Sequence, residues 1–150
     1  MPIPRRQITA LFIVMTVATA GCGFGDEKPG RADKDAPKDF TTTPSGLKYR
    51  VLRNSADTKP TSSSTVKVHY RGWLDDDSEI DNTYTAKKGP AEFRLNQTMP
   101  AWSEGLQLIG QGGMIELEIP PALGYGARGM RPRIPPNATL HYIFELKAVR

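Results

Sequence analysis

The sequence has few of the residues on which most enzyme chemistry depends. Its 150 residues include one cysteine and two histidines, so neither an intrachain disulfide nor a zinc site of cysteine and histidine ligands can be assembled from them. There is no G-x-S-x-G motif, and no free cysteine is expected to act with a histidine as a nucleophile. We therefore expect a protein that uses no metal, no cofactor and no covalent intermediate.

A large excess of one charge is also missing. The 20 basic residues face 16 acidic ones and leave a net charge of +4, which is too small an excess to predict a nucleic-acid partner. The composition, 38% hydrophobic and 24% charged, is typical of one soluble domain with a modest core.

Long hydrophobic runs are absent except near the N-terminus. The apolar segment at residues 8–20 is too short to span a bilayer comfortably. Arg5 and Arg6 precede it and small residues follow it, which predicts a secretory signal peptide over residues 1–21. The order small, small, cysteine resembles a bacterial lipobox and implies that Cys22 becomes the lipidated first residue of the mature protein. A plain secreted protein with a stray cysteine is the alternative.

The segment after the cysteine, residues 22–43, is rich in charge, proline and glycine, and its apolar residues show no period. Such a composition predicts a lipid-anchored flexible linker that holds the domain near a membrane. We expect a lipoprotein of the bacterial cell envelope that faces the periplasm or the exterior. The residue after the cysteine is Gly23 and not the aspartate associated with inner-membrane retention in some bacteria, which favours the outer membrane.

The domain itself is expected at residues 44–150. Apolar and polar residues alternate in five segments, which predicts an antiparallel sheet with one buried face: residues 47–53, 66–73, 91–95, 114–119 and 139–149. Pro100 suits a first helical turn, and Trp102, Leu106 and Ile109 follow at helical spacing. One short helix lying across the apolar face of the sheet gives the fold class α+β.

Several polar residues are expected to be solvent-exposed and to have no role in a functional site. His69 and His141 lie on the charged side of their strands, so we expect both at the surface. The acidic run at residues 75–79 lacks the glycine and glutamate positions of an EF-hand loop, and we interpret it as a solvated hairpin tip. Asp81, beside the apolar Ile80, is considered apart from that run.

Residues 125–140, YGARGMRPRIPPNATL, can form neither a helix nor a central strand, because glycine and proline interrupt them. Long irregular segments in compact domains are usually functional loops or disordered. The G-x-G-x-x-G pattern at residues 124–129 is not a dinucleotide site, because the following prolines prevent the helix that such a site requires. Near this segment stands an apolar set that forms either plain core or a ligand pocket: Tyr70, Phe93, Trp102, Tyr125, Ile134 and Tyr142.

Seven segments in order resemble an FKBP-type peptidyl-prolyl cis-trans isomerase: TPSGLKYRVL, VKVHYRGWL, EIDNTY, AEFRL, PAWSEGLQLI, GYGARG and IPPNATLHYIFEL. The resemblance covers residues 43–150. It implies a twisted antiparallel sheet of about five strands wrapped around one short helix, in agreement with the α+β class. It also implies isomerisation of Xaa-Pro bonds in exported or envelope proteins, which assists their folding. A non-catalytic module that binds proline segments is the alternative.

The resemblance assigns the site position by position. It implies catalytic roles for Tyr125 as hydroxyl donor, Asp81 as an orienting acceptor and Trp102 as the pocket floor. The implied substrate-binding residues are Tyr70, Ile80, Phe93, Met99, Trp102, Tyr125, Ile134 and Tyr142. Residues 125–140 would then be an ordered flap over the proline site.

The partners implied are proline-containing unfolded or flexible polypeptides, and we expect a monomer. Ile80 and Ala91 stand where many members of the family carry aromatic residues. Macrolide inhibitors are therefore expected to bind with reduced affinity, more so than turnover is reduced.

Overall fold

The computed structural model describes residues 28–85 and 89–150. The predicted signal peptide and the lipidation of Cys22 lie outside the described residues. The α-helix α1 is Pro100–Leu106, and two short 3-10 helices are η1 (Leu95–Gln97) and η2 (Pro121–Leu123). The strands are β1 (Thr41–Thr42), β2 (Lys48–Arg53), β3 (Thr65–Leu74), β4 (Glu79–Asn82), β5 (Ala91–Arg94), β6 (Met114–Ile119) and β7 (Leu140–Val149).

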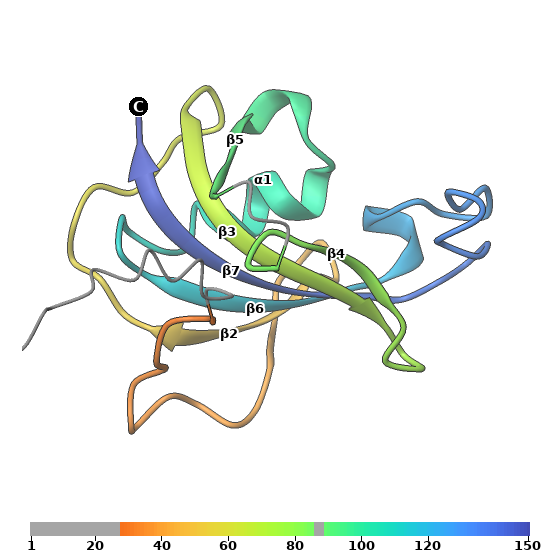
Figure 1. Cartoon of the computed structure of the whole chain (residues 1–150), viewed down its shortest axis with the longest axis horizontal. Coiled ribbons are helices and arrows are strands. Elements are labelled where there is room, and N and C mark those ends of the chain that lie inside the picture. Colours follow the sequence, from red (N-terminus) through yellow and green to blue (C-terminus); the bar gives the residue numbers. More distant parts are fainter. Residues whose placement is uncertain (1–27, 86–88) are drawn as a thin grey trace, which may run out of the picture.

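The strands form one antiparallel sheet in the order β1-β2-β6-β7-β3-β4. β5 pairs with the first part of β3 and β4 with its last part, so both lie along the same edge of β3. The sheet curves around α1, and the loop between β6 and β7 projects beyond one end (Figure 1). The predicted α+β class, with one helix against an antiparallel sheet, is confirmed.

The core lies between α1 and the inner face of the sheet. The pattern of alternation places large apolar side chains on that face from β3, β6 and β7: Val66, Val68, Tyr70, Ile115, Leu117, Ile119, Leu140, Tyr142, Phe144 and Leu146. Burial of each contributes about 1.5–3 kcal/mol. A Cβ atom at Gly105 of α1 would lie 2.8 Å from Leu117 Cδ2, so the glycine allows the helix to approach the sheet closely. This contact fixes the position of Trp102, which lies one turn earlier in the helix.

The outer face of the sheet is less exposed than the alternation suggests. The prediction that His69 lies at the surface is wrong: the residue is only 2% exposed. Its Nδ1 shares a hydrogen bond of 3.1 Å with Thr83 Oγ1, and its ring stacks on that of Tyr84 at 4.8 Å between centroids. The chain after β4 folds back over β3 and covers the histidine. His141 is half-buried, with Nε2 2.7 Å from Asp75 Oδ1.

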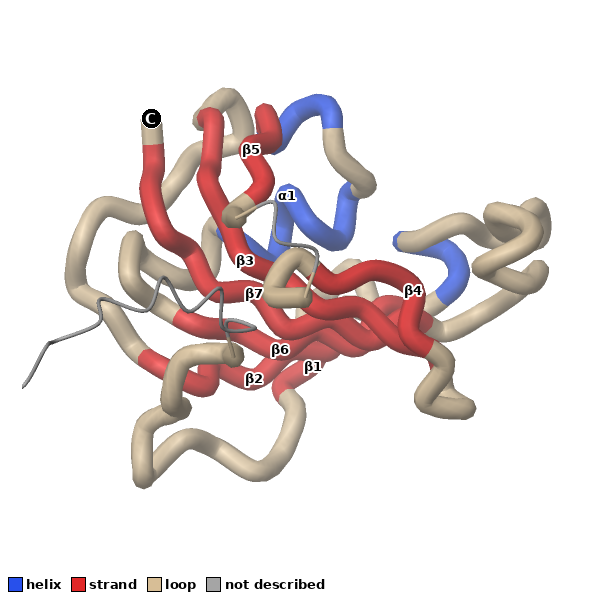
Figure 2. The backbone as a smooth tube through the Cα atoms, viewed as in Figure 1, coloured by secondary structure: helices blue, strands red, loops and turns tan. Residues whose placement is uncertain are grey.

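The described part of the predicted flexible linker also packs on the domain. The Gly30 N–H donates to Glu145 Oε2 at 3.4 Å, and the Asp33 N–H donates to the Leu52 carbonyl at 2.7 Å. The Arg50 guanidinium lies 4.9 Å from the centre of the Phe40 ring. In Figure 2 this segment runs beside β2 and leads into β1. Ordered contacts therefore begin before residue 44, because these charged and aromatic side chains find partners that composition alone does not reveal.

Glu145 is the central charge of this outer face. Its Oε1 accepts hydrogen bonds from the Arg53 guanidinium at 2.7 Å and from Lys147 Nζ at 3.0 Å, and the residue is 5% exposed. Burial alone would raise the pKa of Glu145, but the bonds from Arg53 and Lys147 outweigh it and lower the pKa to about 2. The ionised carboxylate is therefore favoured by folding.

We expect Glu145→Gln to lower the free energy of unfolding at pH 7 by about 1–3 kcal/mol. The folded-state pKa lies below the ordinary value of 4.5, so this contribution is present above pH 4.5 and is lost as the pH falls toward about 2. Urea unfolding from pH 7 to pH 2.5 measures it, and the gap between wild type and variant should shrink with acid. Glu92→Gln, which alters an exposed pair with Arg150, is the control. A gap that stays constant with pH would contradict this account.

Within residues 28–85 and 89–150, none of the helices has the length and hydropathy that a membrane-spanning helix requires.

Candidate active site

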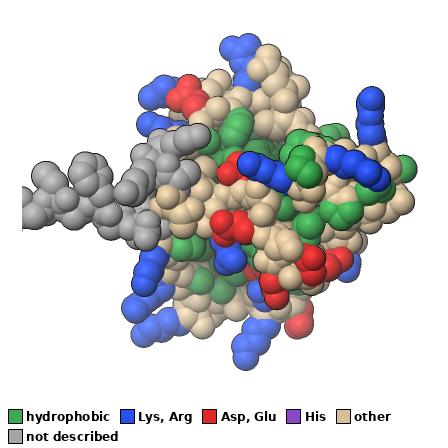
Figure 3. Space-filling view, turned by 45° about the vertical axis from the view of Figure 1, so that its right-hand side comes forward, with side chains coloured by type: hydrophobic (Ala, Val, Ile, Leu, Met, Phe, Trp, Pro, Cys, Tyr) green, Lys and Arg blue, Asp and Glu red, His purple; other side chains and the backbone are tan. Residues whose placement is uncertain are grey.

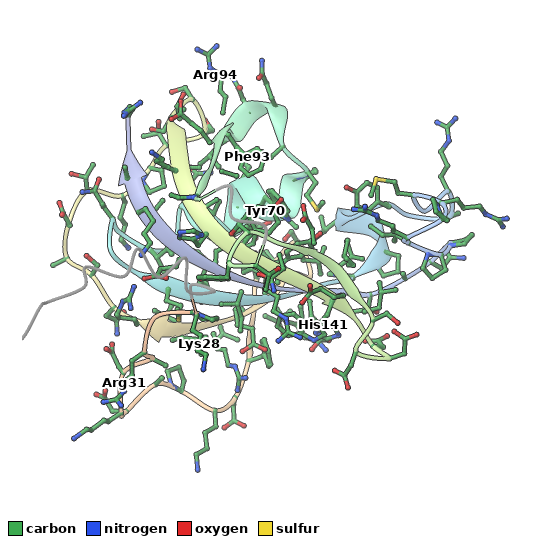
Figure 4. All side chains as sticks on the ribbon, in the orientation of Figure 1. Lys28, Arg31, Tyr70, Phe93, Arg94 and His141 are labelled. Atoms are coloured by element: carbon green, nitrogen blue, oxygen red, sulfur yellow. The ribbon has the colours of Figure 1, made fainter. Side chains whose placement is uncertain are left out.

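A cavity of about 150 Å³ opens where the sheet, α1 and the loop after β6 meet. Side chains from β3, β4, β5, α1 and β7 converge there with side chains from that loop: Tyr70, Ile80, Asp81, Phe93, Trp102, Tyr125, Met130, Arg133 and Tyr142. Figure 4 shows Tyr70 and Phe93 on the side of the sheet that carries α1, whereas Lys28 and Arg31 project from the other side. The structure thus brings together most of the residues assigned to the site from the sequence.

Trp102 packs against three other aromatic residues that line the cavity, and we refer to its ring as the floor. Its ring lies 5.2 Å from that of Tyr70 and meets those of Phe93 and Tyr142 edge-on at 5.3 and 5.1 Å. The residue is 8% exposed, and its Nε1 is buried without a hydrogen-bond partner among the described residues. Interlocked aromatic rings of this kind hold one another in place and form a rigid, apolar and water-poor surface.

One carboxylate, that of Asp81, lines the cavity beside these aromatic rings. The Tyr70 hydroxyl donates to Asp81 Oδ2 at 2.6 Å, and the Asn82 backbone N–H donates to Asp81 Oδ1 at 2.8 Å. Both carboxylate oxygens are therefore engaged by neighbours within the protein. This arrangement suits an anchored acceptor that fixes the orientation of Tyr70.

The two buried tyrosines of the cavity remain neutral in solution near pH 7. Burial raises the pKa of Tyr70, and the hydrogen bond to Asp81 and its charge raise it further. Burial likewise raises the pKa of Tyr142, with smaller effects from Tyr125 and Asp81. Both side chains are therefore phenols, able to donate a hydrogen bond, and neither is a base.

Tyr125 reaches the cavity from the loop that follows η2. The N–H of Gly126 donates to the Pro121 carbonyl at 2.9 Å, and the backbones of Met130 and Ile134 exchange two hydrogen bonds of 2.8 Å. These bonds make the segment an ordered loop. Among the described residues, the Tyr125 hydroxyl has no hydrogen-bond partner, so it is available to a bound group.

Two predicted binding residues do not line this cavity. Met99 lies in an adjoining hollow of about 330 Å³, which shares Phe93, Trp102 and Tyr125 with the cavity. Ile134 is 1% exposed and lines a groove on another side of the loop. Its apolar character reflects its place in the core.

Met130 and Arg133 line the cavity although the sequence did not assign them to it. They lie in an irregular loop, where no period tells which side chains point inward. Met130 is the exposed large hydrophobic side chain among the described residues, but that exposure is known only from the structure. Neither Met130 nor Arg133 is distinguished by a pattern in the sequence.

The cavity offers an apolar floor, phenolic donors and an anchored carboxylate. Among residues 28–85 and 89–150, no group of three or more histidine, cysteine, aspartate or glutamate side chains could hold a metal ion. An engineered apolar cavity of about 150 Å³ holds a benzene-sized ligand, so a five-membered ring fits in this volume. The arrangement can bind such a ring and donate to a neighbouring carbonyl oxygen.

Comparisons with known proteins agree with this geometry. The family model for FKBP-type peptidyl-prolyl cis-trans isomerases matches residues 56–147. FKBP-type peptidyl-prolyl cis-trans isomerase FkpA from Escherichia coli strain K12 is 45% identical over 113 residues, 75% of this chain and 41% of that protein. Outer membrane protein MIP from Legionella longbeachae is 39% identical over 119 residues, 79% of this chain and 50% of that protein. The chain thus spans half the length, or less, of these curated relatives.

Solved structures show the same fold. The crystal structure of FkpA from Escherichia coli superposes with a TM-score of 0.72 at 45% identity, covering 76% of this chain and 53% of that one. The crystal structure of AtFKBP13 superposes with a TM-score of 0.68 at 27% identity, covering 75% of this chain and 99% of that one.

Proposed function

Because the chain belongs to the FKBP-type peptidyl-prolyl cis-trans isomerase family, we propose that it catalyses cis-trans isomerisation of Xaa-Pro bonds in unfolded or flexible polypeptides. The observation that carries the proposal is that Tyr125 of the loop and Trp102 of α1 line one cavity with Tyr70 and Asp81. The proline ring would lie on the Trp102 floor, and the loop at residues 125–140 would act as a flap over it.

Catalysis of this reaction requires only a modest reduction of a rotational barrier. Rotation about an Xaa-Pro amide is slow because resonance gives its C–N bond double-bond character, with a barrier of about 18–20 kcal/mol. Raising a rate of about 0.01 s⁻¹ to about 100 s⁻¹ requires a reduction of only about 5.5 kcal/mol. No bond is broken, so the reaction needs no nucleophile and transfers no proton.

The cavity favours the rotated amide in two ways. Twisting removes the charge-separated resonance form, so a twisted amide is less polar than a planar one and is favoured by the water-poor aromatic floor. The carbonyl oxygen also changes direction during rotation. A hydroxyl such as that of Tyr125 can donate to the oxygen preferentially in the rotated geometry, which lowers the barrier rather than merely tightening binding.

Asp81 would act as a positioning residue. It accepts the hydrogen bond of Tyr70 at 2.6 Å and thereby holds the tyrosine ring against Trp102. A role as general base is not needed, because the substrate loses no proton during rotation.

We expect Tyr125→Phe to lower kcat/KM about 5- to 10-fold, since one hydrogen bond to the rotated carbonyl is worth about 1 kcal/mol. Exchange NMR on a short Leu-Pro or Phe-Pro peptide measures this rate. Tyr49→Phe is the matched control, because Tyr49 is a half-buried tyrosine of β2 outside the cavity. An unchanged rate in Tyr125→Phe would remove the donor role.

The same assay distinguishes an enzyme from a module that only binds proline segments. A pure binder would broaden the peptide signals without speeding exchange between the cis and trans forms. In that outcome the cavity would be a docking site and the isomerase proposal would fail.

We further propose that the protein is a monomeric lipoprotein of the bacterial cell envelope, acting on exported proteins. The support is the signal-like pattern of residues 1–21 and the following Cys22, together with the name of the relative that is an outer membrane protein. Macrolide inhibitors are proposed to bind with reduced affinity, because the cavity wall at position 80 is isoleucine and position 91 is alanine.

A further inference from the structure

Another hollow, on the side of the flap away from Met99, is continuous with the proline cavity at Arg133. It is a groove of about 660 Å³ between the flap and the hairpin tip that joins β3 to β4. Leu74, Asp76 and Ser78 line the hairpin side, and residues 131–136 line the flap side. Arg133 lines both the groove and the cavity, so the two hollows meet at this side chain.

The flap side of the groove is cationic. Arg131 and Arg133 are exposed, and neither makes an ion pair or a hydrogen bond with another described residue. The facing carboxylate is Asp76, whose Oδ1 accepts a hydrogen bond from the Ser78 N–H at 3.0 Å. Figure 3 turns this end of the molecule forward and shows basic, acidic and hydrophobic side chains next to one another. The lining thus carries two cations against one anion.

The balance of charge differs between the two hollows. Of the described residues that line the proline cavity, Arg133 is the one cation and Asp81 the one carboxylate. The groove contains Arg133 without Asp81. Asp76 lines the groove instead, but it faces Arg131 as well as Arg133, so a substrate carboxylate would meet a net positive lining on the groove side.

A polypeptide bound through its proline would extend into this groove. An extended chain advances about 3.3 Å per residue, and Arg133 itself lines the cavity, so a residue within two positions of the proline would lie beside this arginine. The apolar surfaces of Leu74, Pro135 and Pro136 would contact the aliphatic part of its side chain.

We propose that Arg133, assisted by Arg131, gives the protein a preference for substrates with aspartate or glutamate within two residues of the proline. This inference rests on the proposed function and adds a substrate class to it. Arg133 acts as a specificity residue that does not take part in the rotation itself.

The test compares peptides that differ in one residue beside the proline, either glutamate, glutamine or lysine, placed before it or after it. Exchange NMR gives kcat/KM, and chemical-shift titration gives Kd for each peptide. The glutamate peptide should exceed its glutamine counterpart about 3- to 5-fold at low ionic strength, as expected for an exposed ion pair. At about 0.5 M salt the ratio should approach one. Equal values for all peptides at low salt would overturn the proposal.

Variants assign the preference to its residue. Arg133→Gln should remove the glutamate preference, and Arg133→Glu should turn it into a preference for lysine. Arg128→Gln is the matched control, because Arg128 is an exposed flap arginine that lines neither hollow, and it should keep the full preference. A preference that survives in Arg133→Gln would refute the assignment. Failure of the wild type to accelerate even the glutamine peptide would refute the isomerase activity instead, while the Kd ratios would still decide the charge preference.

Discussion

Gly72→Ala is expected to reduce kcat/KM about 100-fold, since small displacements of residues that position a substrate have effects of that size. Gly72 in β3 pairs with Tyr142 in β7. A Cβ atom at position 72 would overlap the Tyr142 ring and lie 2.7 Å from its Cζ. Tyr142 is 3% exposed, packs edge-on against Trp102 and lines the proline cavity, so a displaced ring would alter the shape of that cavity. The strain should also lower the free energy of unfolding by about 1–3 kcal/mol.

A double-mutant cycle identifies the origin of this effect. In a Tyr142→Ala background the added methyl group finds space, so Gly72→Ala should then destabilise the protein much less than in the wild type. Urea unfolding gives the four free energies, and exchange NMR gives the activity of the two single variants. If Gly72→Ala costs as much with alanine at position 142, the clash does not involve the tyrosine ring.

The second large effect is expected from Trp102→Ala. Removal of the indole takes away the surface on which the proline ring would lie, and we expect kcat/KM to fall about 100-fold. The cavity left behind should lower the free energy of unfolding by about 3–5 kcal/mol. Both quantities must be measured, because a loss of stability by itself can lower activity.

Leu106→Ala separates the two contributions. Leu106 is buried in the same helix but does not line the cavity, and its truncation should cost about 2–5 kcal/mol of stability. Under conditions where both variants are folded, Leu106→Ala should keep most of the activity. Equal losses of kcat/KM in both variants would show that Trp102 acts through stability alone.

The sheet and helix could be predicted because their residues repeat with a period. Alternation marks the five strands that carry several inward side chains each, and the spacing of Trp102 and Leu106 marks α1. β1 and β4 were not predicted as strands. β1 has two residues, and β4 buries only Ile80, so neither is long enough to show an alternation.

The flap is the part of the site that could not be predicted from the sequence pattern. Tyr70, Trp102 and Tyr142 lie on periodic elements, and their inward direction follows from the pattern. In an irregular loop the backbone decides direction residue by residue, so the sequence alone did not indicate that Arg133 lines the cavity and Ile134 does not.

The outer face shows a different limit. Alternation separates the two faces of a strand, but it does not reveal whether the more polar face is covered by another part of the chain. His69 is covered by Tyr84, and Glu145 is contacted by Gly30, a residue 115 positions away in sequence. Such long-range coverage leaves no periodic signal near the residue that is covered.

The packing of residues 28–43 has a mechanical consequence. Tension applied from the amino-terminal direction would enter the protein through Gly30 and the Arg53–Glu145 pair, on the side of the sheet opposite α1. A domain held through these contacts would present the face opposite α1 to the point of attachment. The α1 side of the sheet, which carries the cavity, would be directed away from it. The flap and the aromatic floor, which lie on the α1 side, would then be outside the contacts that carry the load.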